Sequence, residues 1–347
     1  MSLPSPSPPL SPSPSPSPSP LPLRWGVIGP GRIAQRFAQA LATLPGARLA
    51  AVTGRNPAHA AAFARHWGAT ATLHASAAAL AADAVVDAVY IATPHTGHAD
   101  AVRACLLAGK PVLCEKPLAP TAAQAEALLA LARERGVFLM EAVWTRLLPA
   151  WAQARQWLDG GAIGRVQALR SSFCFELPYD PANRLFDPAL AGGTLLDIGI
   201  YNLSLSQWLT RREPAAFEIA GVLSPSGVDQ KIDAVLHYAG GETSTFTCAF
   251  DRDAPNEFVI EGSTGRIVVE RGFWEATALR LEPAGAPAQR VERPFTCNGF
   301  EYEIEEAMRC IATGAAESPA VAHADTLATL RLIDALRARL GVRYPFE

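Results

Sequence analysis

The feature of the sequence that most constrains its fold is a glycine-rich turn, GPGRIA at residues 29–34. The apolar run at 25–28 before it predicts a buried strand, and apolar residues at helical spacing after it predict a helix. In this setting Gly29 allows the tight turn, Gly31 leaves room for a pyrophosphate and Ala34 lets the helix pack closely on the strand. The free N–H groups at the start of such a helix attract phosphate. The turn therefore predicts a dinucleotide-binding unit.

The alternation of strand-like and helix-like segments continues as far as residue 143. Strands are expected at 25–28, 49–52, 85–92, 112–114 and 137–140, with helices between them, including one at 57–67 and one that begins after Thr121. Such spacing implies right-handed βαβ units, which build a doubly wound parallel sheet. We therefore expect an α/β protein in which residues 23–143 form an N-terminal Rossmann domain that binds NADP.

After residue 149 the pattern becomes that of a mixed domain. A helix is expected near 193–209, strands at 231–238, 243–250, 257–261 and 266–270, and two closing helices at 299–312 and 323–340. Glycine-containing turns between the strands suit antiparallel pairing. We expect residues 144–347 to form an α+β substrate and oligomerisation domain with a large open, mainly antiparallel sheet.

Residues 1–22 differ from the rest because they are almost entirely serine and proline. This composition predicts a disordered, extended tail that forms no core. The tail lacks the basic and apolar regions of a secretory signal. We interpret it as a spacer, with a docking segment as the alternative.

The composition excludes several classes of partner. A formal net charge of −3 provides no basic surface for nucleic acid. No uncharged apolar run is long enough to span a membrane. The six cysteines form no C-x-x-C pair, and the histidines show no metal-ligand spacing. We therefore expect a cytoplasmic protein with reduced thiols and no metal.

The end of the second strand indicates which nicotinamide cofactor fits. An acidic residue there would bind the ribose 2′-OH of NAD, whereas arginine accommodates the 2′-phosphate of NADP. The sequence here is TGRN, so Arg55 can pair with that phosphate, and Thr53 and Asn56 are secondary contacts. A solvated surface arginine is the alternative. NADP is the predicted cofactor, and we expect Arg32 and Ile33 of the glycine-rich turn to contact it as well.

Another strand ends at Thr93-Pro94-His95. Ligands of open α/β sheets bind at the carboxyl ends of the strands. We therefore expect Thr93 and Pro94 to lie along the nicotinamide. His95 and His98 are interpreted as polar residues at a helix start rather than as catalysts.

The segment CEKP at 114–117 is typical of the Gfo/Idh/MocA oxidoreductases, and the chain resembles this family from about Arg24 onward. MEAVWTR at 140–146 and GGTLLDIGIY at 192–201 are similar to the branch that holds dimeric dihydrodiol dehydrogenase and NADP-dependent D-xylose 1-dehydrogenases. The resemblance implies that Lys116 lies beside the nicotinamide with its ammonium on the reacting oxygen. A cation placed there stabilises developing negative charge. It also implies that Glu115 contacts the cofactor, while Pro117 holds the turn, with a cis peptide bond in some members.

Two further residues of the similar segments are candidates for catalysis. Asp197 and Tyr201 are four apart on the second-domain helix and so project from one face into the same cleft. A phenol titrates near about pH 10, and a nearby lysine would lower the pKa of Tyr201, making it a proton relay. Asp197 would then orient the substrate hydroxyl or Lys116. Many relatives carry histidine in place of Tyr201, so the acid/base group stays open between Tyr201 and Lys116.

The substrate contacts are expected from the same resemblance. Trp144 and Arg146 resemble substrate-pocket residues of that branch and are able to stack on, and hydrogen-bond to, a polyol ring. An interdomain contact is the alternative for both. Asn183 and Arg184, in the loop before the Asp197 helix, are further substrate candidates.

The expected function is an NADP(H)-dependent oxidoreductase that moves a hydride to or from the CH–OH group of a small cyclic diol or sugar. A trans-dihydrodiol and an aldopyranose such as D-xylose are the candidate substrates. A nucleotide-binding sensor or regulator of the same fold is one alternative, and an enzyme like glucose-fructose oxidoreductase with tightly bound NADP is another. The resemblance also implies a homodimer that pairs through the open face of the second sheet.

Overall fold

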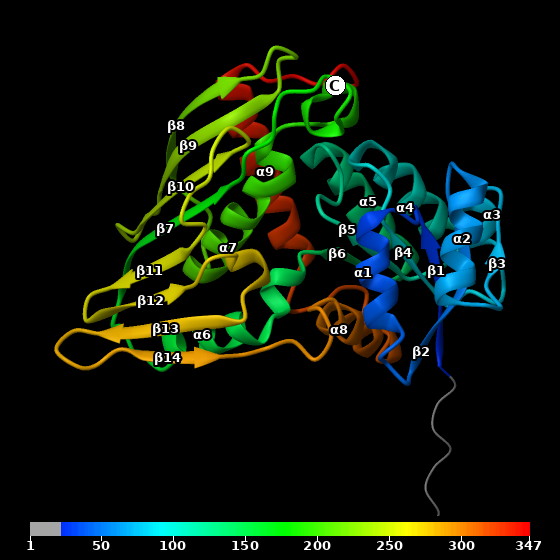
Figure 1. Cartoon of the computed structure of the whole chain (residues 1–347), viewed down its shortest axis with the longest axis horizontal. Coiled ribbons are helices and arrows are strands. Elements are labelled where there is room, and N and C mark those ends of the chain that lie inside the picture. Colours follow the sequence, from blue (N-terminus) through cyan, green and yellow to red (C-terminus); the bar gives the residue numbers. More distant parts are fainter. Residues whose placement is uncertain (1–21) are drawn as a thin grey trace, which may run out of the picture.

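The computed structural model describes residues 22–347, which form two sheets with their helices side by side (Figure 1). The predicted Ser/Pro-rich tail lies, apart from Pro22, outside the described residues.

The first sheet confirms the predicted doubly wound arrangement. Its strand order is β3-β2-β1-β4-β5-β6, and neighbouring strands pair in parallel. The strands are β1 (Leu23–Ile28), β2 (Ala47–Thr53), β3 (Thr72–Leu73), β4 (Ala88–Ile91), β5 (Val112–Glu115) and β6 (Leu139–Ala142). The order reverses between β1 and β4, and ligands of such sheets bind at this switch point.

The helices of this domain connect its strands, and three of those described begin at a side-chain cap. They are α1 (Arg32–Leu41), α2 (Pro57–Trp67), α3 (Ala77–Ala81), α4 (His98–Leu107) and α5 (Ala122–Arg135). Asn56, Ser76 and Thr121 accept backbone N–H bonds at the starts of α2, α3 and α5. Gly136, with φ of 62°, ends α5 in the left-handed conformation. The sequence analysis missed β3 and α3, which are short, and the expected strand at 85–92 is shorter than predicted.

The second sheet is open and mainly antiparallel, as predicted. Its order is β14-β13-β12-β11-β7-β10-β9-β8, and β7 and β10 are its parallel pair. The strands are β7 (Val166–Cys174), β8 (Ala216–Leu223), β9 (Asp229–His237), β10 (Thr243–Ala249), β11 (Phe258–Gly262), β12 (Gly265–Val269), β13 (Ala278–Pro283) and β14 (Gln289–Glu292). The sequence predicted β9 to β12 and missed the other four.

Helices cover the face of this sheet that looks toward the first domain (Figure 1). They are α6 (Pro149–Asp159), α7 (Ile200–Thr210) and α9 (His323–Leu340), and a π-helical turn at Leu195–Gly199 leads into α7. The sheet also carries exposed ion pairs between neighbouring strands, among them Arg170–Glu261 and Arg266–Glu282.

The end of the chain returns to the first domain. Helix α8 (Glu301–Ala312) packs against α1, and α9 packs against both α5 and α7. His323 Nε2 lies 2.7 Å from the carbonyl oxygen of Leu139 in β6, and Asp334 accepts a bond from Ala122 N at the start of α5. The predicted boundary near residue 143 therefore marks where the sequence pattern changes, while α8 and α9 join the two halves. Within residues 22–347 there is no helix long and apolar enough to cross a membrane.

Candidate active site

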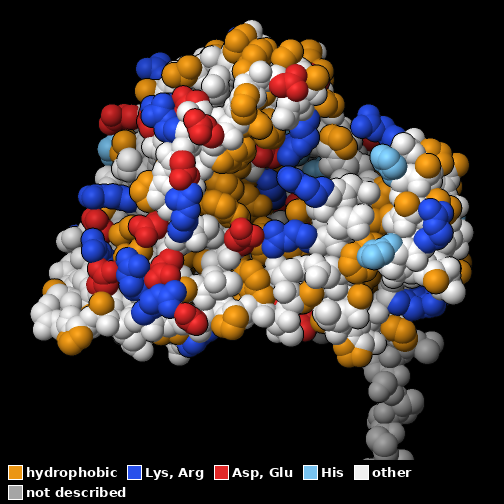
Figure 2. Space-filling model, viewed as in Figure 1, with side chains coloured by type: hydrophobic (Ala, Val, Ile, Leu, Met, Phe, Trp, Pro, Cys, Tyr) orange, Lys and Arg blue, Asp and Glu red, His pale blue; other side chains and the backbone are white. Residues whose placement is uncertain are grey.

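A cavity of about 1020 Å³ runs between the two domains. It begins at the carboxyl ends of β1, β2 and β4 and ends among aromatic side chains of the second domain. Figure 2 shows Lys and Arg side chains gathered beside apolar ones in the hollow at the centre of the molecule. The predicted cofactor residues line this cavity: Gly29, Gly31, Arg32, Ile33, Arg55, Thr93, Pro94, Glu115 and Lys116.

The glycine-rich turn has the shape that a dinucleotide requires. Gly29 has φ of 88°, and a Cβ there would lie 2.7 Å from the backbone nitrogen of Thr93, so a larger residue would push β1 and β4 apart. At Gly31 a Cβ would meet nothing within 4 Å among the described residues, so the space beside this backbone belongs to the cavity. The turn leads directly into α1, whose free N–H groups face that space. These residues therefore fit a pyrophosphate.

The far end of the nucleotide cleft is lined by Arg55, His59 and Ser76. Sequence reasoning missed His59 and Ser76, because both belong to helix starts that gave no ligand signal. Thr53 and Asn56, the expected secondary contacts with the cofactor, also line the cavity. Both make hydrogen bonds within the protein: Thr53 Oγ1 donates to His74 O at 2.8 Å, and Asn56 Oδ1 accepts from Ala58 N at 3.0 Å. The described residues that line this end carry no carboxylate.

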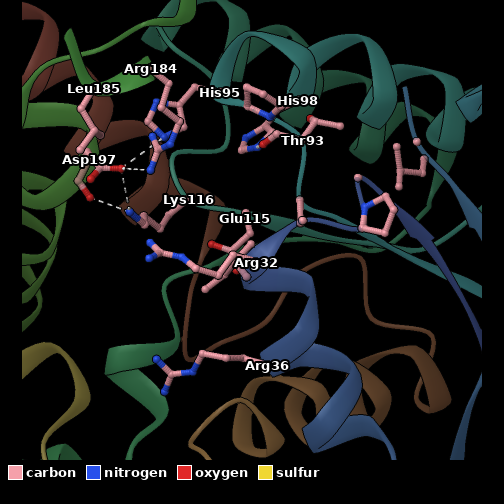
Figure 3. A pocket seen from close by; sticks show the side chains of 18 of the residues that line it. Arg32, Arg36, Thr93, His95, His98, Glu115, Lys116, Arg184, Leu185 and Asp197 are labelled. Atoms are coloured by element: carbon pink, nitrogen blue, oxygen red, sulfur yellow. Dashed lines mark hydrogen bonds and ion pairs between the residues drawn. The ribbon is translucent and has the colours of Figure 1, made fainter. Parts of the chain in front are cut away.

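Lys116 lines the cavity directly after β5, and its side chain points toward Asp197 (Figure 3). Its Nζ donates to the main-chain oxygen of Asp197 at 2.5 Å and lies 3.8 Å from the Oδ1 atom of that residue. The same nitrogen is 4.9 Å from the ring centre of Tyr201. The Lys116–Pro117 peptide bond is cis. The three predicted catalytic residues are therefore neighbours, although they come from different domains.

Asp197 lies beside the cations Lys116 and Arg184 and beside the imidazole of His95 (Figure 3). Arg184 Nη2 lies 3.1 Å from its Oδ1 atom, and His95 Nε2 lies 3.8 Å from the same oxygen. Burial alone would raise the pKa of Asp197, but the charges of Lys116 and Arg184 outweigh burial and lower the pKa to about 2. Asp197 is therefore ionised at neutral pH and can hold both cations in place.

The expected shift of the Tyr201 pKa was wrong in direction. Burial, followed by the negative charge of Glu115, raises the pKa of Tyr201 well above its ordinary value. Lys116 lies over the face of the ring rather than at the hydroxyl, where Trp144 Nε1 donates a bond at 3.3 Å. Tyr201 is therefore a neutral phenol that has a proton to give.

The two histidines behave differently from each other. His98 begins α4, and its ring nitrogens lie 2.7 Å from Pro117 O and 2.8 Å from Thr93 O, so it ties together the loops that follow β4 and β5. His95 lies in the cavity wall against Asp197, and burial lowers its pKa to about 3. His98 is the helix-start residue that the sequence analysis expected. His95 also lines the cavity and contacts Asp197, which the sequence analysis did not predict.

Of the four predicted substrate contacts, Trp144, Asn183 and Arg184 line the cavity. Asn183 Oδ1 also accepts a bond from Leu185 N and so shapes its own loop. Arg146 is not among the described lining residues. Its side chain is 2% exposed and pairs with Asp325 at 2.9 Å, so the structure places it against α9 within the second domain, and neither in the cavity lining nor in a contact between the two domains.

The end of the cavity in the second domain has an aromatic wall, of which the sequence analysis predicted only Trp144. Phe173 and Trp274 stack with ring centres 3.5 Å apart, and the Arg36 guanidinium lies 4.8 Å from the ring centre of Trp144 and 5.0 Å from that of Phe300. We name this the aromatic wall; its members in the cavity are Trp144, Phe173, Phe175, Trp274 and Phe300. Phe173 lies in β7 and Phe175 directly after it, and the sequence analysis missed this strand. Trp274 lies in a short 3₁₀ turn.

Glu115 also lines the cavity. Its Oε1 atom accepts a bond from the Tyr90 hydroxyl at 2.6 Å, and Tyr90 in turn stacks on Phe37 of α1. Burial raises the pKa of Glu115. This contact fixes the strand end from which Lys116 projects. Within residues 22–347 there is no group of His, Cys, Asp and Glu arranged to hold a metal ion.

Comparison with known proteins agrees with this geometry. Residues 23–143 match the family model described as an oxidoreductase family with an NAD-binding Rossmann fold, and residues 151–268 match the GFO/IDH/MocA C-terminal domain. A Mus musculus protein named trans-1,2-dihydrobenzene-1,2-diol dehydrogenase is 34% identical over 336 residues, which cover 93% of this chain and 98% of that protein. The Homo sapiens protein of the same name is 33% identical over 331 residues, with the same shares covered.

Solved structures of oxidoreductases are also similar to this chain over most of its length. A 3-ketoreductase from Actinomadura kijaniata, in complex with NADP and TDP-benzene, has a TM-score of 0.80 and 29% identity, and the match covers 91% of this chain and 97% of that one. An aldose-aldose oxidoreductase from Caulobacter crescentus, complexed with glycerol, has a TM-score of 0.84 and 27% identity over 92% and 98% of the two chains.

Proposed function

Because the chain belongs to the Gfo/Idh/MocA oxidoreductase family, we propose that it is an NADP(H)-dependent enzyme that transfers a hydride to or from the CH–OH carbon of a cyclic diol or sugar. The observation that carries this proposal is the meeting of Lys116, Asp197 and Tyr201 at the end of the nucleotide cleft. A nicotinamide bound there supplies or accepts the hydride. The side chains then have to manage the charge and the proton on the substrate oxygen.

The protein's own groups divide this work between them. In the reduction direction, the carbonyl oxygen gains negative charge, which the Lys116 ammonium stabilises at close range. Tyr201, neutral because its pKa is raised, donates the proton to that oxygen. Asp197 and the main-chain oxygen beside it hold Lys116 in position. In the oxidation direction the step runs in reverse from the ionised form of Tyr201, which accepts the proton of the substrate hydroxyl.

The aromatic wall supports a ring-shaped substrate. Its flat faces suit a cyclohexadiene or a pyranose ring, and the few polar groups at this end, Asn183 and Arg184, suit bonds to hydroxyls. We propose a trans-dihydrodiol as the first candidate substrate, because the wall is largely apolar and two relatives are named for that reaction. An aldopyranose such as D-xylose is the second candidate.

A substrate panel tests the proposal. Purified protein is mixed with NADP+ and either trans-1,2-dihydrobenzene-1,2-diol or D-xylose, and NADPH formation is followed by absorbance. We expect turnover with the diol and slower turnover with the sugar. Tight NADP binding without any turnover would favour a sensor or regulator instead. Protein that purifies with bound NADP and cycles between two sugars would favour an enzyme like glucose-fructose oxidoreductase.

Cofactor choice is tested at Arg55. Arg55→Ala is expected to weaken NADP+ binding by about 10- to 100-fold, because a charge-assisted bond to a phosphate contributes about 1.5–3 kcal/mol. The affinity for NAD+ should stay within about twofold, since NAD+ has no 2′-phosphate for the side chain to bind. Arg65→Ala, an exposed change on the same α2 helix outside the cavity lining, is the control and should alter neither affinity. Equal losses for both cofactors in Arg55→Ala would show that Arg55 does not contact the 2′-phosphate.

We also propose a cytoplasmic homodimer that pairs through the open face of the second sheet. The support is that helices cover one face of this sheet, while strands β7 to β14 carry exposed charged side chains that reach across to neighbouring strands. Sedimentation analysis should give twice the monomer mass, and a monomer at micromolar concentration would contradict the proposal.

A further inference from the structure

A short turn before the helical segment that carries Asp197 and Tyr201 is held by two side chains that do not line the cavity. The turn spans residues 192–195 and leads into the π-helical segment that carries Asp197. One of the two side chains is Asp229, at the start of β9, which is fully buried. Its Oδ2 atom accepts bonds from Thr194 Oγ1 and from Leu195 N, both at 2.7 Å. A carboxylate in this position binds the free N–H groups at the start of the helix.

The backbone of the turn is shaped to admit this carboxylate. Gly193 has φ of 117°, which side-chain-bearing residues rarely adopt, and a Cβ there would collide with Asp229 Oδ1. At Gly192 a Cβ would lie 2.7 Å from the main-chain oxygen of Leu185. Both glycines are therefore needed for the turn to pack between β9 and the Arg184 loop.

The second side chain is Tyr344, which approaches the same turn from another direction. Its hydroxyl donates to the main-chain oxygen of Gly192 at 2.7 Å, and the residue is 3% exposed. Tyr344 is itself held in place, because the Arg337 guanidinium lies 4.2 Å from its ring centre and Glu347 accepts bonds from both Arg337 and Tyr344 N. Tyr344 therefore restrains the turn at Gly192, and Asp229 restrains it at Thr194 and Leu195.

The turn connects these two side chains to the reacting groups. Gly193 N donates to Leu185 O at 2.9 Å, which fastens the Arg184 loop to the turn. Two residues after the turn, Asp197 accepts the Arg184 guanidinium at 3.1 Å and the Lys116 ammonium at 2.5 Å. A shift of the turn would move both acceptors, and with them the ammonium that meets the substrate oxygen.

We propose that Asp229 and Tyr344 are positioning residues, which act through the turn at 192–195 to place Asp197, and thereby Lys116, for hydride transfer. The inference rests on the proposed function, because the rate of turnover is the quantity that positioning would change. It predicts loss of kcat without loss of nucleotide affinity, since neither residue touches the nucleotide cleft.

Tyr344→Phe is the sharpest test, because it removes one hydroxyl and keeps the ring beside Arg337. Its kcat with NADP+ and the diol should fall by about tenfold, the effect of about 1.4 kcal/mol at the transition state. Its KM and Kd for NADP+ should stay within about twofold of wild type. Tyr238→Phe is the matched control, because Tyr238 is also a buried tyrosine of the second domain, at 4% exposed, but does not contact the turn. Equal losses of kcat in the two variants would overturn the proposal.

A second pair of variants separates positioning from general loss of stability. Asp229→Ala should lower kcat by about 100-fold, the size of effect that a shift of about 1 Å in a catalytic group produces. Asp229→Asn should recover most of that loss, because its amide oxygen can accept the same two bonds. If kcat is as low in Asp229→Asn as in Asp229→Ala while both bind NADP+ normally, the bonds to Thr194 and Leu195 do not position the catalytic groups. The proposal then fails.

Hydrogen–deuterium exchange distinguishes failure of this inference from failure of the proposed function. Backbone amides of residues 193–201 should exchange faster in Tyr344→Phe than in wild type or Tyr238→Phe. Absence of turnover in the wild-type protein would overturn the proposed function, and the exchange rates would still report on the turn. Unchanged exchange in Tyr344→Phe would overturn the positioning role whatever the activity.

Discussion

Lys116→Met is expected to lower kcat by about three orders of magnitude and to leave the affinity for NADP+ within a few-fold of wild type. Removing one preorganised stabiliser of transition-state charge typically costs about 10²–10³ in rate. Here the loss should be at the upper end, because the Lys116 side chain is only 13% exposed and water cannot replace its ammonium well. Methionine keeps most of the volume of the side chain, so the walls of the cavity stay in place.

The control for this experiment is Lys110→Met. The Lys110 ammonium also donates to main-chain oxygens, those of Asp83 at 2.9 Å and Val86 at 2.6 Å, but it lies outside the cavity lining. Its loss should reduce the free energy of unfolding and leave kcat unchanged. For both variants, kcat is measured with the diol under saturating NADP+, and the affinity for NADP+ is measured by a separate titration. An unchanged kcat in Lys116→Met would remove the lysine from the mechanism.

Tyr201→Phe is expected to lower kcat by about 10²–10⁴, the usual contribution of a positioned proton donor or acceptor. Phenylalanine keeps the ring that lies against Lys116 and against Phe173, whose ring centre is 5.9 Å away. What is lost is the hydroxyl, which accepts the Trp144 bond at 3.3 Å. If Tyr201→Phe keeps nearly the full rate while Lys116→Met does not, then Lys116 is the acid/base group. The double variant should lose far less than the product of the two losses, because the residues act as a unit.

The pH dependence of Tyr201→Phe adds a test of the proton's origin. Burial raises the pKa of Tyr201, so the phenol stays protonated through neutral pH. The rate of carbonyl reduction should therefore be flat across neutral pH, and the rate of oxidation should rise with pH as the proton becomes easier to remove. In Tyr201→Phe the rise of the oxidation rate with pH should be absent if this hydroxyl carries the proton. A wild-type reduction rate that falls as pH rises through neutrality would contradict a neutral phenol with a raised pKa.

The nucleotide half of the site could be predicted from the sequence because its signals are local. Gly29, Gly31 and Arg55 act through the turn or strand end on which they lie, and Lys116 follows directly from a strand. The alternation of strand-like and helix-like segments also predicts a doubly wound parallel sheet. The family resemblance then supplied Asp197 and Tyr201, which the fold brings to the same cavity.

The substrate half depends on contacts between distant segments. Phe173 and Trp274 stack although 100 residues separate them, and no local sequence pattern predicts such a contact. Arg146 resembled a pocket residue, yet its side chain turns toward Asp325 of α9. The sign of the Tyr201 pKa shift was missed because burial is a property of the packed molecule and outweighs a single neighbouring charge.

The packing of α8 on α1 and of α9 on α5 limits how the molecule can be divided. A fragment that stopped at residue 143 would retain the complete parallel sheet and its glycine-rich turn, but it would expose to water the apolar surfaces that α8 and α9 cover. Ile304 and Ala307 of α8 and Leu330 and Ile333 of α9 are fully buried in the whole chain. Such a fragment should aggregate or bind nucleotide poorly. Engineering that exchanges nucleotide-binding halves between relatives should therefore transfer residues 301–340 together with the N-terminal sheet.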